Sequence, residues 1–277
     1  MTSLTPKIIG KLTATTALFV AMALSSEAQT LISHYTLDGT VADSGSLGID
    51  GALLNDAGFT AGGAGSFSQA LSTDSVGSQN FFRADTSDNS AFGLDAITIA
   101  MWVNISSFND TDRLLSNVTS STGFDFYLTN SGTSSGDYRL VFNFNSTSGA
   151  VYSSDDAALQ TTEWVFVAVT YDSSIVSGDN VFFYVGNEST SLALTSGAQK
   201  SGSIVTSTAD LEIGGTPATG NDRTPVSLFN DVRIYDGALS LSELEGLRVA
   251  VIPEPSTYAM GLGLIGLLFV FARRQRK

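Results

Sequence analysis

The chain has 277 residues, contains no cysteine and carries a formal net charge of −14. The absence of cysteine excludes disulfide bonds, thiol catalysis and thiolate metal sites. The negative charge disfavours nucleic acid and anionic lipid as partners, because both are themselves negatively charged.

The first 28 residues have the pattern of a secretory signal peptide. Lys7 and Lys11 precede an apolar stretch over residues 12–24, and small residues follow at Ser26 and Ala28. A signal peptidase reads small residues at such positions. We therefore expect export and cleavage after Ala28. A buried N-terminal helix is the alternative, but it accounts for neither the flanking charge nor the cleavage pattern.

Apolar residues that recur at every second position predict a series of strands in one domain over residues 29–250. The strands are expected at 31–37, 97–105, 124–128, 140–144, 164–169, 181–185, 211–213 and 228–235. Polar turns separate them, and the glycine-rich stretch from Gly45 to Gly65 is expected as loop with short strands. The strand at 164–169 is apolar on both faces, so we expect it inside a sheet. Many short strands at this spacing indicate an all-β sandwich or barrel.

One helix is predicted near the end of this domain. Ser240 and Glu243 form a capping box ahead of Leu244 and Leu247. The capping serine and the glutamate three residues later place the first turn of the helix at this point.

The tail over residues 251–277 differs in composition from the domain. A Pro253-Glu254-Pro255 motif precedes an apolar run over 258–272, and the chain ends in a basic cluster formed by Arg273, Arg274, Arg276 and Lys277. The run would make roughly 22 Å of helix at 1.5 Å per residue. That is short for a permanent span, which needs about 20 residues, and the basic cluster would hold the end in the cytoplasm.

This order of motif, apolar run and basic cluster resembles the PEP-CTERM sorting signal of Gram-negative envelope proteins. The resemblance implies that an exosortase recognises the tail while it is anchored in the inner membrane, and then removes it. It also implies delivery to the cell envelope, the outer surface or the extracellular exopolysaccharide matrix. An ordinary C-terminal membrane anchor is the alternative.

The domain itself resembles laminin G-like domains of the concanavalin A-like lectin/glucanase superfamily. The resemblance rests on a series of blocks in a fixed order, namely 35–39, 43–45, Gly51, 97–103, 163–172, 183–186, 211–215 and 231–240. The last block, Asp231-Val-Arg-Ile-Tyr-Asp-Gly-Ala-Leu-Ser240, is the most specific. The implied fold is a two-sheet antiparallel jelly-roll sandwich.

The same resemblance implies a calcium site. Carried over by position, its ligands would be Asp38 and Asp231, with backbone oxygens of the glycine-rich loop near Gly51. The sequence departs from the family at Asn230, where an acidic residue often stands. An amide oxygen can still coordinate calcium, but the site loses a charge and should bind the ion more weakly. Turn and strand-end hydrogen bonds are the alternative roles of both aspartates.

No catalytic motif is apparent. The superfamily's glucanases carry a Glu-x-Asp-x-x-Glu strand whose carboxylates flank the sugar bond about 5 Å apart, and this spacing does not occur here. A Ser-His-Asp triad would have to use His34, which is the single histidine and lies in an expected strand. We therefore expect a protein that is not an enzyme.

The remaining question is what the domain binds. Trp102 and Trp164 could stack on a sugar, but both lie in expected strands, which favours packing in the core. We expect a surface or matrix protein that binds a glycan or another protein, with glycan favoured by family analogy. A purely structural protein of the exopolysaccharide matrix and a divergent glycan-active enzyme are the alternatives.

Overall fold

The computed structural model describes residues 29–73, 79–130, 138–145, 149–153, 162–217 and 223–253. The expected signal peptide, Glu254, Pro255 and the basic cluster at 273–277 lie outside the described residues. Within the described ranges, no helix has the length and apolar character needed to cross a membrane.

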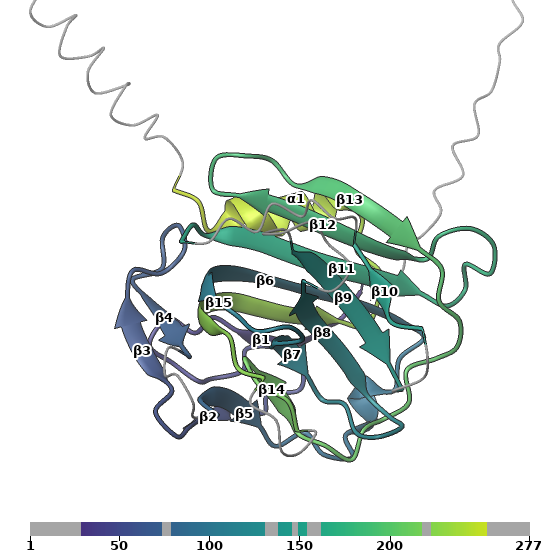
Figure 1. Ribbon diagram of the computed structural model, residues 1–277, viewed down its shortest axis with the longest axis horizontal. Helices are drawn as coiled ribbons and strands as arrows, with labels where there is room; N and C mark the ends of the chain where they lie inside the picture. The colour runs from purple at the N-terminus through teal and green to yellow at the C-terminus, as the bar shows by residue number, and fades with distance from the viewer. Residues whose placement is uncertain are drawn as a thin grey trace, which may run out of the picture.

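Two antiparallel sheets packed face to face confirm the expected sandwich (Figure 1). In the described part of the chain, sheet A has eight strands: β13 (Ala193–Ala198), β12 (Val181–Asn187), β11 (Val165–Asp172), β6 (Ala96–Ser107), β15 (Val226–Tyr235), β4 (Gln69–Ser72) and β3 (Gly58–Ala61) in this order, with β1 (Leu31–Tyr35) also paired to β15. Sheet B has seven: β10 (Val151–Tyr152), β9 (Arg139–Phe144), β8 (Phe124–Thr129), β7 (Arg113–Ser116), β14 (Leu211–Ile213), β5 (Phe81–Ala84) and β2 (Gly51–Leu54). A short 3-10 helix, η1, covers Ser90–Phe92.

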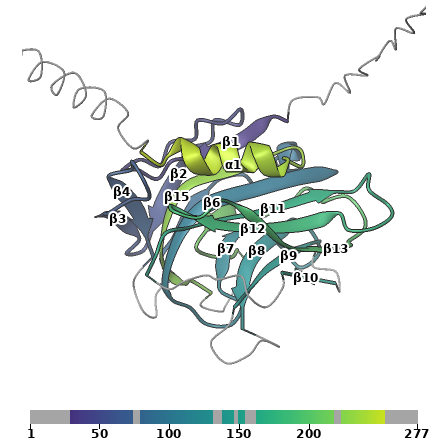
Figure 2. The same ribbon diagram turned by 90° about the horizontal axis from the view of Figure 1, so that it is seen from above.

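Sheet A is covered on both faces, which explains why β11 is apolar on both faces over residues 165–169. Val165, Val167 and Val169 belong to the main core between the sheets. Phe166 and Ala168 belong to a second core on the opposite face of sheet A. The helix α1 (Leu241–Ala250) contributes to this second core and lies across the outer face of sheet A (Figure 2). The prediction of an interior strand is confirmed, because β11 pairs with β12 and β6.

The predicted capping box at the start of α1 is also confirmed. The Ser240 side chain accepts a hydrogen bond from the Glu243 amide, and the Glu243 carboxylate accepts one from the Ser240 amide at 2.7 Å. The hydrogen bonds that the Ser240 hydroxyl and the Ser240 amide donate to the Glu243 carboxylate lower the pKa of Glu243. The helix is therefore fixed at its first turn by residues that are adjacent in sequence.

β15 changes its partner half-way along its length. Its first half pairs with β4 through Leu228 and Phe229, and its second half pairs with β1. The register against β6 is broken between Asn230 and Arg233, and Asp231 has a φ of 52°. This irregularity turns the side chains of two residues of the predicted calcium site toward the ends of β1 and β4.

Candidate functional site

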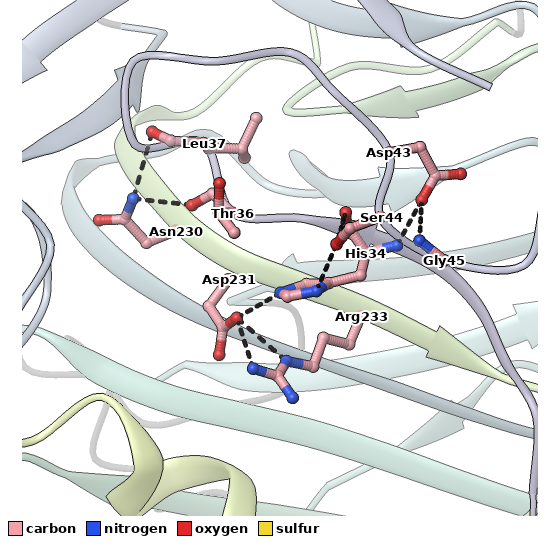
Figure 3. Close-up of polar contacts among 9 residues, drawn as sticks. All are labelled: His34, Thr36, Leu37, Asp43, Ser44, Gly45, Asn230, Asp231 and Arg233. Atoms are coloured by element: carbon pink, nitrogen blue, oxygen red, sulfur yellow. Dashed lines mark hydrogen bonds and ion pairs between the residues drawn. The ribbon is translucent and has the colours of Figure 1, made fainter. Parts of the chain in front are cut away.

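Asn230 fills the gap where β1 ends and β4 begins. Its side-chain nitrogen donates to the carbonyl oxygens of Thr36 at 3.1 Å, Leu37 at 3.2 Å and Gln69 at 2.9 Å. Its side-chain oxygen accepts a hydrogen bond from the Ala64 amide at 3.0 Å. Figure 3 shows the contacts to Thr36 and Leu37. The amide is fully buried, and both of its polar atoms hold neighbouring backbone segments together.

Asp231 is held by two basic side chains. One carboxylate oxygen, Oδ1, lies 2.7 Å from His34 Nε2 and 3.0 Å and 2.9 Å from two nitrogens of Arg233 (Figure 3). The other oxygen is buried and has no hydrogen-bond partner among the described residues. A calcium ion on this carboxylate would have to share it with both basic side chains, which disfavours Asp231 as a ligand.

His34 also contacts a serine, so the structure contains a Ser-His-Asp series. Ser44 Oγ lies 2.8 Å from His34 Nδ1, on the opposite side of the ring from Asp231 (Figure 3). Acyl transfer further needs amide donors that stabilise the oxyanion. The amides of residues 44–47 all donate to oxygens of β1 or of their own loop. The three side chains therefore work as a brace between β1, this loop and β15.

The other two residues of the predicted calcium site have separate partners. Asp38 Oδ1 accepts hydrogen bonds from Ser68 Oγ at 2.9 Å and from the amides of Ser68 and Gln69 at 3.0 Å and 2.7 Å. Gly51 starts β2 in sheet B, where a Cβ would lie 2.0 Å from the ring of Phe82. Asp38 and Asn230 both form hydrogen bonds with the backbone of Gln69. Gly51 instead allows β2 to pack closely against the ring of Phe82. The described residues contain no group of three acidic or histidine side chains placed to hold a metal, and calcium binding stays a prediction.

The two tryptophans have different environments. Trp102 is fully buried and packs edge-on against Phe166, with ring centroids 5.5 Å apart. Trp164 is only partly buried and lines an open hollow of about 400 Å³. The expectation of core packing is confirmed for Trp102, whereas Trp164 packs against the second core but is only partly buried. The reason is position: Trp164 precedes the first residue of β11, at the margin of the second core.

The Trp164 hollow is lined by Thr162, Glu163, Trp164, Asn187, Glu188 and Ser189. These residues come from the segment just before β11, from the last residue of β12 and from the turn that follows β12. None of the polar ones was singled out by the sequence analysis as a binding residue. No spacing pattern signals them, because the two segments meet only through the pairing of β11 with β12.

Hydrogen bonds fix the walls of this hollow. The indole nitrogen of Trp164 donates to the Gly62 carbonyl at 3.2 Å, and Glu188 accepts from the Gly65 amide at 2.7 Å. The Asn187 side chain accepts from the amides of Ser189 and Thr190 at 2.9 Å and 2.7 Å, which closes the turn. The ring of Trp164 and the polar groups around it are therefore held in place by the protein itself.

Comparison with known protein families agrees with this architecture. The model of the concanavalin A-like lectin/glucanases superfamily, of the laminin G type, matches residues 77–245. The model of the PEP-CTERM protein-sorting motif matches residues 251–277. A search among curated proteins finds no match.

Solved structures share the fold at low sequence identity. Domain 4 of AbnA, a GH43 extracellular arabinanase from Geobacillus stearothermophilus solved with arabinotriose, is 18% identical with a TM-score of 0.60, over 80% of this chain and all of that domain. A botulinum neurotoxin type C structure, from work on cell entry through two ganglioside molecules, is 15% identical with a TM-score of 0.58. The binding domain of Paraclostridial Mosquitocidal Protein 1 is 13% identical with a TM-score of 0.58.

The extent of these matches differs. Of this chain, 81% matches the neurotoxin and 80% the mosquitocidal protein, and each match spans 52% of the other chain. The chain thus corresponds to about half the length of these toxin structures, and to the whole of the arabinanase domain.

Proposed function

Because the chain belongs to the concanavalin A-like lectin/glucanase superfamily, we propose that it is a non-enzymatic module that binds glycan through the Trp164 hollow. Its PEP-CTERM motif indicates export and sorting to the cell envelope. An exosortase-type enzyme removes the tail, and the domain then works at the outer surface or in the extracellular matrix.

The observation that carries this proposal is a partly exposed tryptophan set among polar groups. A sugar ring has an apolar face of C–H groups and an edge of hydroxyl groups. An indole ring can cover the first, while carboxylates and amides can hydrogen-bond to the second. The Trp164 hollow offers both surfaces in one place, with Glu163 and Asn187 beside the ring.

The solved relatives support the class of ligand. The arabinanase domain was solved with arabinotriose, and the neurotoxin work concerns gangliosides. Both are sugars or carry sugars. At these identities the likeness establishes the fold alone, so the ligand class of this chain rests on the Trp164 hollow.

A non-enzymatic role is supported by the state of the candidate catalytic groups. The amides of residues 44–47 already donate hydrogen bonds, either to carbonyl oxygens of β1 or to the Asp43 carboxylate. In the Trp164 hollow, Glu188 already accepts a backbone hydrogen bond. Neither place combines a nucleophile or acid with a group that would stabilise a transition state.

The proposal is tested by a glycan array probed with the purified full-length chain, with and without calcium. We expect binding to a limited set of glycans, loss of this binding in Trp164→Ala and retention in Trp164→Phe, which keeps an aromatic face. Wild-type protein that binds no glycan would contradict the proposal and would favour a purely structural matrix protein.

A further inference from the structure

A second hollow lies on the outer face of sheet B, the sheet opposite Trp164. It has a volume of about 520 Å³ and is lined by Arg83, Asp85, Ser87, Thr208, Ala209, Asp210, Glu212 and Pro217. Leu211 and Ile213 of β14 belong to the main core. Because successive side chains of a strand alternate between its faces, Glu212 points away from that core and toward the hollow.

Glu212 is fully buried and only half satisfied. Arg83 stands opposite it on β5, and the Arg83 Nε and Nη2 atoms both bind the same oxygen, Oε1, at 2.9 Å and 2.7 Å. The other oxygen, Oε2, is buried and has no hydrogen-bond partner among the described residues. A buried carboxylate oxygen without a donor is costly, so such a group calls for an explanation.

A second acceptor in the same hollow is also unsatisfied. Asp210 lies two residues before Glu212, and its Oδ1 is buried without a partner in the described structure. Its other oxygen is 3.9 Å from Arg83. With Asp85, the described residues that line the hollow include three carboxylates and one guanidinium. Burial raises the pKa of Glu212, with nearby Asp210 acting in the same direction and Arg83 opposing it.

We propose that this hollow binds the primary ammonium group of an amino sugar in a glycan that carries free amines. An ammonium group has three N–H donors and a positive charge, which suit the unpartnered oxygens of Glu212 and Asp210. An anionic sugar would be repelled by the excess of carboxylates. A neutral hydroxyl group would bring a donor but no charge. The inference rests on the proposed glycan-binding function, and it assigns a different hollow.

The ligand would add a charge-assisted contact to each acceptor. Hydrogen bonds between charged partners are about twice as strong as neutral ones. Arg83 would stay on Oε1 and keep the carboxylate oriented, leaving Oε2 for the ligand. The guanidinium of Arg83 is itself positioned by Phe81, whose ring centroid lies 5.2 Å away.

The test compares an oligosaccharide of glucosamine with the N-acetylated oligosaccharide of the same length, by calorimetry on the full-length chain. We expect a preference for the free amine of about tenfold or more, in keeping with a hydrogen bond to a charged group. The preference should weaken as salt rises. Equal affinity for the two oligosaccharides would overturn the proposal.

Substitutions in the hollow test whether the preference for the free amine arises there. Glu212→Gln should abolish the preference, and Asp210→Asn should reduce it. Glu243→Gln, the same change on α1 outside both hollows, should leave it intact. Thermal melts of each variant show whether it is folded. If both Glu212→Gln and Asp210→Asn fold and still prefer the free amine, the assignment to this hollow is wrong.

Two further experiments distinguish a failure of the amine site from a failure of the proposed Trp164 site. Trp164→Ala should lose the glycans found on the array and keep the preference for glucosamine. If wild type binds no array glycan but binds glucosamine oligosaccharides through Glu212, the Trp164 site fails and the amine site stands. Binding of a lysine amide as tight as that of glucosamine would assign the hollow to protein amines and overturn the sugar assignment.

Discussion

His34 Nε2 lies 2.7 Å from a carboxylate oxygen of Asp231, and this contact joins the first strand of the domain to the last. Arg233 binds the same oxygen. Asp231 itself sits at the point where β15 breaks its register. His34 and Asp231 are residue types that often act in catalysis or metal binding. Here they hold the first strand of the domain to the last.

Replacing Asp231 by alanine should therefore lower the free energy of unfolding by about 3–5 kcal/mol, because it leaves the two basic side chains without their buried partner. Denaturant unfolding measures this loss. Asp236→Ala is the control, since Asp236 is exposed and its carboxylate accepts a hydrogen bond from the Thr30 amide, with no basic side chain recorded against it among the described residues. Equal losses in the two variants would contradict the brace.

The family resemblance implies a calcium site, but the contacts of Asp231 and Asn230 lead us to expect that calcium at millimolar concentration leaves the melting temperature unchanged relative to chelator. The physical reason is that Asp231 already binds His34 and Arg233, and the Asn230 oxygen already accepts a backbone hydrogen bond. A calcium-dependent rise in melting temperature that Asp38→Ala removes would instead support the calcium site predicted from the sequence.

The two tryptophans should respond differently to truncation. Trp102→Ala should cost about 3–5 kcal/mol, since the indole is fully buried in the second core. Trp164→Ala should cost less, because this side chain is only partly buried, at the margin of the second core. Denaturant unfolding of the two variants measures both losses of stability. Equal losses would mean that Trp164 contributes to core packing as much as Trp102 does.

The capping box predicts a pH-dependent contribution from Glu243. Its pKa is lowered in the folded state, so its charge stabilises the fold at neutral pH, and this contribution is lost as the pH falls through that pKa. Glu243→Gln should be less stable than wild type at neutral pH, and the gap should close in acid. Ser240→Ala should cost about 1 kcal/mol at neutral pH. A gap that persists in acid would exclude the charge as its cause.

The tail should be dispensable for folding. The Val251 carbonyl accepts a hydrogen bond from the Ser66 amide at 2.7 Å, and Val251 is buried. A chain ending at Ile252 keeps these contacts, so we expect it to be folded by circular dichroism. An unfolded truncation would mean that the tail is part of the domain.

Sorting should depend on the basic cluster. Replacing Arg273, Arg274, Arg276 and Lys277 by glutamine should impair membrane retention or tail removal, because cytoplasmic positive charge fixes the orientation of a short span. Cell fractionation and the size of the mature protein report this. Normal processing in the variant would show that the cluster has no such role.

Sequence periodicity was sufficient for the strands that are long and buried, such as β6 and β11. It gave no signal for β7, which has four residues, or for β13, whose residues are exposed or half-buried. These strands are held by their neighbours in the sheets, and tertiary pairing of this kind overrides local preference. The capping box was predictable because both of its residues lie within one turn.

The candidate sites were harder to predict for the same reason. Asp38, Asn230 and Asp231 were identified by resemblance, but their hydrogen-bond partners depend on a register break in β15. The partial exposure of Trp164 was not predicted, because a strand pattern does not show where the layer that covers a sheet ends. The unpartnered oxygen of Glu212 depends on which Arg83 atoms reach it across two strands, and no local pattern encodes that.

Tryptophan fluorescence tests the central claim most directly, since the chain has only two tryptophans and Trp102 is buried. A soluble quencher should reduce only part of the emission, and a glycan selected on the array should protect that part. Trp164→Phe should remove the quenchable component, whereas Trp102→Phe should leave it. Glycan binding that leaves the quenching of Trp164 unchanged would contradict the assignment of the glycan site to this hollow.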